Sequence, residues 1–160
     1  MLDPILHELQ RNSQTCPREL AKLFNLTEAE VKKRIAAWEE DGTILGYQAV
    51  IDPERAKKTD VTALIEVKLT PERDGGFDRI ARRIAKFDEV KSCYLMSGGY
   101  DLAIIVEGPT LREIARFVAE KLSTIGGVIS TATHFKLKIY KDKGLEARAD
   151  HHLDKLPVTP

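Results

Sequence analysis

Residues 16–42 constrain the fold of this chain more than any other stretch, because they specify two short helices and the corner between them. Thr27 and Glu30 form a T-x-x-E capping box, in which each side chain satisfies an otherwise unpaired amide at a helix N-terminus. Pro17 suits the first position of the preceding helix, and Asn25 suits the corner because asparagine adopts a left-handed backbone at modest cost. The stretch therefore predicts a helix-turn-helix whose second helix starts after Thr27.

A helix-turn-helix lays its second helix in the major groove of DNA, so this motif points to a DNA-binding unit. An ordinary helical hairpin is the alternative, since apolar residues at helical spacing usually indicate only a core. The residues expected in that core are Leu20, Phe24, Leu26 and Val31.

Composition describes a soluble globular protein, with 31% charged and 42% hydrophobic residues among 160. No apolar run approaches the roughly 18 residues that span a bilayer, and the N-terminus lacks the pattern of a signal peptide. We therefore expect a cytoplasmic protein with no membrane partner. Cys16 and Cys93 have no partner spacing that suggests a metal or a redox pair, which predicts two free thiols.

Charge is distributed unevenly, although the net charge is zero. Residues 1–60 hold 9 basic and 11 acidic side chains, a net charge of −2, whereas residues 61–141 hold 13 and 10, a net charge of +3. The acidic balance of the first part counts against DNA binding. Lys32, Lys33 and Arg34 nevertheless cluster on the second helix of the helix-turn-helix. That helix therefore has a basic face although the net charge of residues 1–60 is negative.

The first part of the chain predicts a winged helix-turn-helix domain over residues 1–51. Asp3 caps a first helix that reaches about Arg11. Residues 43–52, TILGYQAVID, are rich in β-formers around a glycine and predict a strand, a turn and a strand, which form the wing. Residues 52–60 are polar and interrupted by a proline, so we interpret them as a linker.

The second part, residues 61–141, predicts the element order β-α-β-β-α-β of a ferredoxin-like domain, and thus an α+β fold with both helices on one face of an antiparallel sheet. The tripeptide Ile-Ala-Arg occurs at residues 80–82 and again at 114–116, as a two-fold repeat predicts, although so short a match also arises by chance. Residues 142–160 hold little to bury, which predicts a mobile tail. Strands are expected at 61–70, 90–97, 100–108 and 129–141, and helices at 77–87 and 111–125.

A winged helix followed by a βαββαβ domain resembles the Lrp/AsnC family of bacterial and archaeal transcription regulators. The match covers about residues 2–141 and is carried by ELAKLFNLT, by Arg34 and Trp38, and by the segments ILGYQAVIDPE and SGGYDL. The chain departs from the family pattern at Glu28 to Glu30, at Cys16, where a serine cap is usual, and at Trp38, where leucine is usual. The acidic residues bear on the choice of operator, and the other two on packing.

The resemblance implies that the first domain binds double-stranded DNA and that the second dimerises and senses an amino acid or related metabolite. Dimers of the family assemble further, commonly into octamers. Lysines supply affinity that is independent of sequence, and a guanidinium pairs with phosphate or with base edges. The expected DNA-contacting residues are Thr27, Glu28, Ala29, Lys32, Lys33 and Arg34, with Val31, Ile35 and Trp38 turned inward.

The expected effector site lies in the loop after the second strand, at Gly98, Gly99, Tyr100 and Asp101. Two glycines let a backbone approach a small ligand, and the carboxylate suits an α-amino group. Without the resemblance, a plain hairpin turn is the favoured interpretation. With it, the loop matches the family's ligand region, and two threonines of the last strand face the same pocket across a subunit interface. These are Thr131 and Thr133.

Two other functions compete with a transcription regulator. An enzyme is the weaker one, because the histidines show no ordered relation to a nucleophile, and we find no phosphate loop and no metal-ligand spacing. We therefore expect no catalysis, no metal and no cofactor. A metabolite-binding interaction module that does not bind DNA is the stronger competitor. The cations Arg79, Arg82, Arg83 and Lys86 are interpreted most simply as the solvated side of a helix, with contact to DNA in a larger assembly as the alternative.

Overall fold

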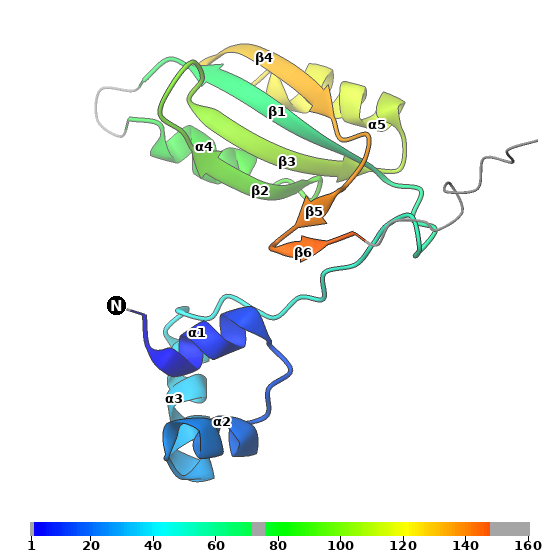
Figure 1. Ribbon diagram of the computed structural model, residues 1–160. Coiled ribbons are helices and arrows are strands. Elements are labelled where there is room, and N and C mark those ends of the chain that lie inside the picture. The colour runs from blue at the N-terminus through cyan, green and yellow to red at the C-terminus, as the bar shows by residue number, and fades with distance from the viewer. Residues whose placement is uncertain (1, 72–75, 148–160) are drawn as a thin grey trace, which may run out of the picture. The chain divides into compact units, whose positions relative to one another are not determined.

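The computed structural model describes residues 2–71 and 76–147, and the chain divides into two compact units (Figure 1). The first unit spans Met1–Val50 and the second Ile51–Pro160. Among the described residues, no helix combines the length and the apolar character needed to cross a membrane. Each unit is built around its own hydrophobic core.

The first unit consists of the helices α1 (Pro4–Arg11), α2 (Pro17–Phe24) and α3 (Glu28–Glu40). Their buried apolar faces meet in a small core, which is what an amphipathic helix of this length needs to be stable. The buried members are Ile5, Leu9, Leu20, Ala21 and Val31, and Phe24, Leu26, Ile35, Trp38 and Ile44 pack against them. The predicted helices and their core are confirmed.

The corner between α2 and α3 has the predicted chemistry. Asn25 adopts φ 53° and ψ 47°, in the left-handed region, and ends α2. The amide of Leu26 then donates to the carbonyl of Ala21 over 2.9 Å, which returns the chain toward the core. A helix-turn-helix results.

The segment after α3 differs from the prediction, because the structure contains no strand between Glu40 and Val61. The two predicted wing strands are therefore wrong. Leu45 is 96% exposed, so the apolar residues of this segment find no sheet to cover, and an isolated two-stranded hairpin is marginal in water. Near its start the segment is fixed to α3, where the Ile44 amide donates to the Trp38 carbonyl over 2.8 Å and the Tyr47 hydroxyl donates to Glu39 over 2.9 Å.

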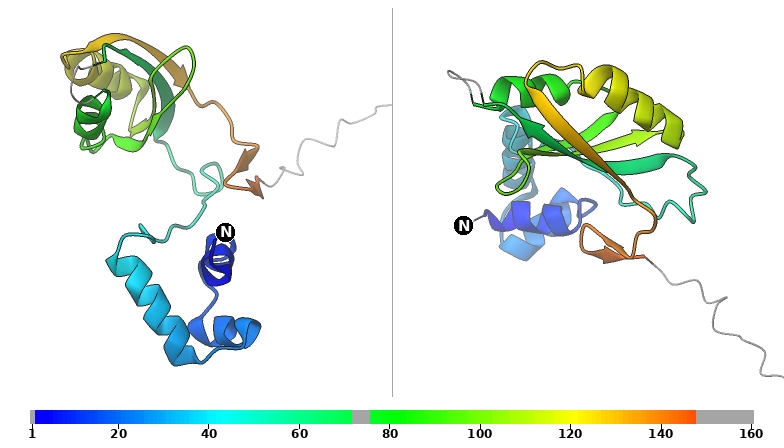
Figure 2. Two further views of the ribbon diagram at one scale, coloured as in Figure 1. Left: turned by 90° about the vertical axis from the view of Figure 1, so that its left-hand side faces the viewer. Right: turned by 90° about the horizontal axis from the view of Figure 1, so that it is seen from above.

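The second unit contains a four-stranded antiparallel sheet in the order β2-β3-β1-β4, with both long helical segments on one face (Figure 2). This is the predicted ferredoxin-like arrangement. Its elements are β1 (Val61–Leu69), α4 (Asp78–Ile84), β2 (Val90–Leu95), β3 (Leu102–Gly108), α5 (Leu111–Arg116), η1 (Phe117–Leu122) and β4 (Val128–Phe135).

Strand register decides which side chains face the helices. Ile65 pairs with Ile104 of β3 and with Thr133 of β4, and alternate residues of the central strand β1 are buried on the same side. That side is the core, because strand side chains alternate between the two faces of a sheet. The buried residues are Ala63, Ile65, Val67, Leu69, Ile80, Ile84, Leu102, Ile104, Val106, Ile114, Phe117, Leu122 and Ile125.

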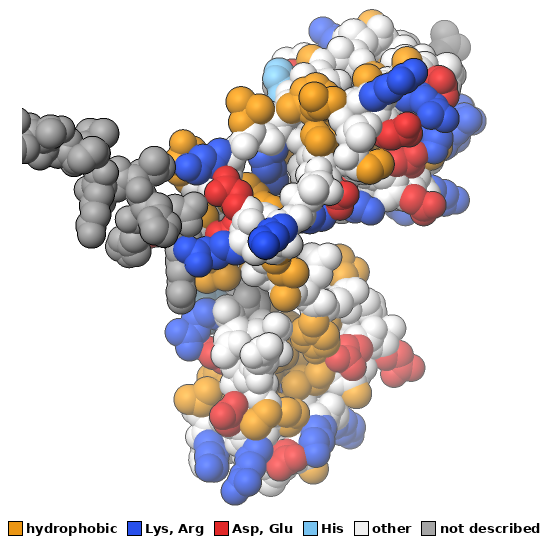
Figure 3. Space-filling view, turned by 90° about the vertical axis from the view of Figure 1, so that its right-hand side faces the viewer, with side chains coloured by type: hydrophobic (Ala, Val, Ile, Leu, Met, Phe, Trp, Pro, Cys, Tyr) orange, Lys and Arg blue, Asp and Glu red, His pale blue; other side chains and the backbone are white. Residues whose placement is uncertain are grey.

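Among the described residues of the second unit, no helix covers the opposite face of the sheet, and we call it the bare sheet face. By register it presents Leu64, Glu66, Tyr94, Ile105 and His134. Tyr94 is 56% exposed, and Figure 3 shows that hydrophobic side chains stand at the molecular surface among charged ones.

The second long helix is not uniform. Residues 111–125 predict one α-helix, but from Phe117 to Leu122 the chain winds as a π-helix, with the Ser123 amide donating to the Val118 carbonyl over 2.8 Å. The wider turn brings residues five apart onto one face, so Phe117 and Leu122 are both buried.

The end of the described chain also differs from the prediction. The last sheet strand ends at Phe135 rather than at residue 141, and β5 (Lys141–Asp142) and β6 (Leu145–Glu146) form a small hairpin. Lys143 and Gly144 make its turn with positive φ at both positions, which the right-handed twist of a hairpin favours. The expected tail thus begins inside a hairpin, and its residues 148–160 lie outside the described part of the chain.

Candidate DNA-binding and effector sites

The first turn of α3 is held by the predicted capping box. The Thr27 hydroxyl accepts from the Glu30 amide over 3.2 Å, and the Glu30 carboxylate accepts from the Thr27 amide over 2.8 Å and from its hydroxyl over 2.7 Å. These hydrogen bonds lower the pKa of Glu30, because they stabilise its charged form. The start of the helix is therefore fixed by its own sequence.

The face of α3 that follows the cap is open to solvent. Val31 is fully buried, and Ile35 and Trp38 pack against the core, as predicted. The six residues expected to contact DNA lie outside this buried stripe. Each of Thr27, Glu28, Ala29, Lys32, Lys33 and Arg34 is exposed.

The cations of this face differ in their partners. The Lys32 ammonium lies 2.6 Å from the Glu28 carboxylate, and this contact lowers the pKa of Glu28. The Arg34 guanidinium lies 3.6 Å from the carboxylate of Asp3, which also caps α1. Among the described residues, Lys33 has no ion-pair partner. Its charge is therefore the one most available to an external anion.

Two further cations on α2 were not singled out from the sequence. Arg18 and Lys22 are exposed and lie four residues apart, on one side of the helix. The charge of Arg18 adds, after the larger effect of Lys32, to the lowering of the Glu28 pKa, so this guanidinium lies near the start of α3. Their helical spacing after Pro17 was the signal available in the sequence, since the first helix of such a motif crosses the DNA backbone.

The glycine loop of the second unit is open around its glycines. Gly98 has φ 139°, and a Cβ atom on Gly98 or on Gly99 would meet no heavy atom within 4 Å. The Met96 amide donates to the Asp101 carbonyl over 2.8 Å and closes the loop. Tyr100, between the glycines and Asp101, is half-buried.

Asp101 fastens this loop to the end of the central strand. Its carboxylate accepts from the Leu69 amide over 2.7 Å, and its own amide donates to the Val67 carbonyl over 3.0 Å. The sequence suggested only a ligand partner for this carboxylate. One of its oxygens is instead engaged with the protein, so Asp101 has a structural part whatever else it binds.

The two threonines do not meet the glycine loop within one chain. Thr131 pairs with Val67 and Thr133 with Ile65, so β1 separates both from β3 and the loop that precedes it. With strands spaced about 4.8 Å apart, that separation is on the order of 10 Å. The prediction of a pocket that both share requires a second subunit, as it did from the sequence.

A pocket of about 180 Å³ lies elsewhere in the second unit, between the end of β3 and the start of α5. Each of its three carboxylates already has a cation. Glu89 pairs with Lys121, Glu107 with Lys58 and Glu113 with Arg116. In the described part of the chain, no three His, Cys, Asp or Glu side chains are grouped as metal ligands. The lining is Glu89, Val106, Glu107, Gly108, Pro109, Glu113, Ile114 and Phe117.

Comparison with family models divides the chain as its fold does. Residues 5–44 match the model described as winged helix-turn-helix DNA-binding, and residues 62–145 match the model described as Lrp/AsnC ligand binding domain. The first match covers all three helices except Pro4, and the second covers the four-stranded sheet except Val61.

Individual relatives agree with these models. The uncharacterized HTH-type transcriptional regulator YugG of Bacillus subtilis (strain 168) is 45% identical over 141 residues, which are 88% of this chain and 85% of that protein. A proline dehydrogenase transcriptional activator of Rhodobacter capsulatus is 33% identical over 134 residues, 84% and 86% of the two chains. The crystal structure of a Neisseria meningitidis transcriptional regulator with L-methionine covers 96% of this chain and 100% of its own, with 25% identity and a TM-score of 0.67.

Proposed function

The chain belongs to the Lrp/AsnC family of transcriptional regulators, and from this premise we propose which of its residues contact DNA and which bind an effector. Because residues 5–44 match a DNA-binding model, a module that does not bind DNA is set aside. An enzyme is set aside too, since the relatives named above are transcriptional regulators.

We propose that α3 lies in the major groove and presents its exposed N-terminal half to the bases. The observation that carries this proposal is the exposed position of Lys33 on a capped helix whose other side is buried. The helix has 13 residues and is about 20 Å long, and a major groove about 12 Å wide admits one helix. Lys33 neutralises a phosphate, and the small side chain of Ala29 allows close approach to the base edges.

Phosphate contacts on either side of the groove position this helix. We assign them to Arg18 and Lys22 of α2 and to Arg34 of α3. On binding DNA, Arg34 exchanges its contact with Asp3 for a contact with a phosphate. Breaking the contact with Asp3 costs little free energy, because the pair is partly exposed and exposed ion pairs contribute about 0–1 kcal/mol.

The second unit binds a small amino acid in this proposal. Open backbone at Gly98 and Gly99 offers amides to the ligand's carboxylate, and Asp101 pairs with its ammonium group. The Neisseria meningitidis regulator is in complex with L-methionine, and the Rhodobacter capsulatus relative is a transcriptional activator of proline dehydrogenase. These two proteins support an amino acid as the chemical class of the effector.

A homodimer completes this site. The bare sheet face carries Leu64, Tyr94 and Ile105, and an apolar sheet face is stable when another layer covers it. A second copy provides that layer. Thr131 and Thr133 lie on the helix side of the edge strand β4, so in this proposal that edge, rather than the bare sheet face, brings them to the loop of a neighbouring copy. Assembly of dimers into octamers, as in the family, would align several α3 helices along one duplex.

Fluorescence anisotropy with a labelled duplex from the region upstream of the protein's own gene tests the DNA contacts. Lys33→Ala is expected to weaken binding and to reduce the salt slope by about one phosphate contact. Lys143→Ala, on the β5–β6 turn of the second unit, is the matched control and should leave both unchanged. An unchanged salt slope for Lys33→Ala would refute its phosphate contact.

A further inference from the structure

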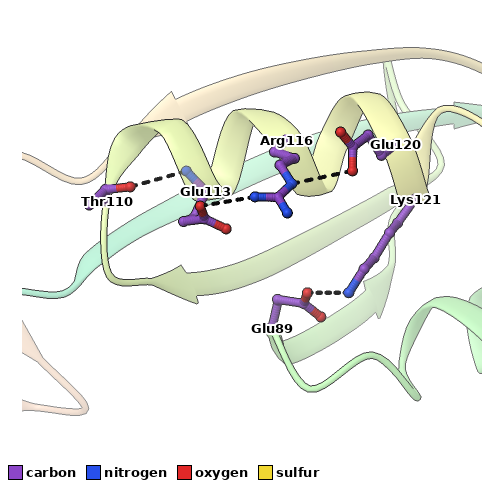
Figure 4. Close-up of polar contacts among 6 residues, drawn as sticks. All are labelled: Glu89, Thr110, Glu113, Arg116, Glu120 and Lys121. Atoms are coloured by element: carbon purple, nitrogen blue, oxygen red, sulfur yellow. Dashed lines mark hydrogen bonds and ion pairs between the residues drawn. The ribbon is translucent and has the colours of Figure 1, made fainter.

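The internal repeat places two arginines at equivalent positions on the two helices that cover the sheet. Arg82 of α4 and Arg116 of α5 each follow an Ile-Ala pair, 34 residues apart. On α5 this arginine is neutralised by its neighbours. Its guanidinium lies 3.3 Å from the Glu113 carboxylate and 3.3 Å from that of Glu120 (Figure 4).

The same positions on α4 carry the opposite charge. The residues 34 positions before Glu113 and Glu120 are Arg79 and Lys86. With Arg83 added, four cations occupy positions i, i+3, i+4 and i+7. The first three lie along one side of α4, and Lys86 follows in the turn after the helix ends at Ile84. We call this set, Arg79, Arg82, Arg83 and Lys86, the α4 basic stripe. Ile80 and Ile84 on the opposite side are buried in the core, so the stripe faces solvent.

Most of the stripe is not neutralised by the protein itself. Within residues 2–71 and 76–147, neither Arg82, Arg83 nor Lys86 forms an ion pair. A helix C-terminus attracts one or two cations through its dipole. Four cations in succession, three of them without a carboxylate, exceed what that effect explains.

We propose that the α4 basic stripe is a second DNA-contacting surface, which binds phosphates of the duplex that flanks the site occupied by α3. This inference rests on the proposed function of α3. Residues 79–86, which comprise most of α4 and the turn after it, extend about 10 Å, and duplex DNA carries one negative charge per about 1.7 Å of its axis. The stripe therefore faces several phosphates at once. Arginine suits this partner because its planar fork binds phosphate through two parallel hydrogen bonds.

The full-length protein and two duplexes test this surface. A 20-bp duplex contains only the site protected by the protein upstream of its own gene, and an 80-bp duplex contains the same site with its flanks. The test variant carries Arg82→Gln, Arg83→Gln and Lys86→Gln together, and the control carries Arg116→Gln on the equivalent, neutralised position. All side chains changed are exposed. Circular dichroism is used to check that both variants fold.

On the 80-bp duplex, losing three phosphate contacts reduces the magnitude of the salt slope by about 2.7. Raising the salt from 50 to 200 mM should therefore weaken the binding of the triple variant by a factor that is about 40 times smaller than the factor for the wild type. On the 20-bp duplex the variant and the wild type should bind alike. The Arg116→Gln control should match the wild type on both.

Equal salt slopes for the triple variant and the wild type on the 80-bp duplex overturn the inference. It is also overturned if the Arg116→Gln control reduces the salt slope as much as the triple variant does. A wild-type protein that binds neither duplex overturns the proposed function as well, which separates the two failures. A triple variant whose assembly mass falls in the absence of DNA, by analytical ultracentrifugation, assigns the stripe to contacts between copies and also overturns the inference.

Discussion

Replacing Asp101 separates its contact within the protein from its proposed contact with the effector. In Asp101→Asn the amide oxygen still accepts from the Leu69 amide, while the negative charge that would hold an ammonium group is gone. In Asp101→Ala both are lost. The two variants should therefore differ in stability, whereas both should bind the effector more weakly than the wild type.

The expected magnitudes follow from the 2.7 Å hydrogen bond between the Asp101 carboxylate and the Leu69 amide. Hydrogen bonds to charged groups contribute about 1.5–3 kcal/mol, and the half-buried site places this one at the lower end. Asp101→Ala should thus lower the free energy of unfolding by about 1.5 kcal/mol, and Asp101→Asn by under about 1 kcal/mol. Urea denaturation measures both, with Asp88→Asn, an exposed carboxylate of the same unit, as control.

Calorimetry supplies the second half of this test, once a screen of the twenty amino acids by thermal shift has identified the effector. Both Asp101 variants should bind it at least tenfold more weakly than the wild type, whereas Asp88→Asn should bind it normally. An Asp101→Asn protein with wild-type affinity would show that the carboxylate only fastens the loop. An Asp101→Ala protein as stable as the wild type would refute the structural part of the reasoning.

Three further predictions concern charge, backbone and pH. Lys33→Ala, assayed as described, should weaken DNA binding more at 50 mM than at 200 mM salt, because its contribution is a released counterion. Gly127→Ala should lower the free energy of unfolding by about 1–3 kcal/mol in urea denaturation, since Gly127 has φ 96° and the new Cβ would lie 2.6 Å from Ile80 Cδ1, whereas Gly126→Ala meets open space and should be near neutral. The pKa of Glu30 is lowered by the capping box, so its stabilisation of α3 is complete above the ordinary glutamate pKa of about 4.3 and is lost as the pH falls through the lowered value. Helix content followed by circular dichroism from pH 7 to pH 2.5 should fall less steeply in Glu30→Gln, and an identical profile would contradict this linkage.

Local chemistry explains why so much of the first unit follows from the sequence. The capping box of Thr27 and Glu30 and the left-handed Asn25 involve residues three positions apart or a single residue, so the sequence displays them directly. The contact of Arg34 with Asp3 joins two helices, and no local pattern reveals it. The prediction of two wing strands was wrong for a related reason, since residues that favour strands form one only where a partner strand is present.

In the second unit the element order was predictable, and the partners of individual side chains were not. Periodicity located β1, α4 and α5, because alternation and helical spacing survive in any chain that buries one face. The bond from Leu69 to Asp101 crosses 32 residues, and the separation of Thr131 from the loop depends on strand order. The sequence repeat shows that Arg79 and Lys86 stand where the second repeat has Glu113 and Glu120. Only the structure shows that these two glutamates neutralise Arg116.

One titration tests the central claim that the first unit binds DNA under the control of a ligand of the second. Fluorescence anisotropy measures the Kd of the wild-type protein for its upstream duplex, alone and with each of the twenty amino acids at constant salt. We predict that at least one amino acid changes the Kd by fivefold or more, the lower range of allosteric coupling. The same amino acid should have no such effect in Asp101→Asn. A Kd that no amino acid changes, or a duplex that the protein does not bind, would contradict the account.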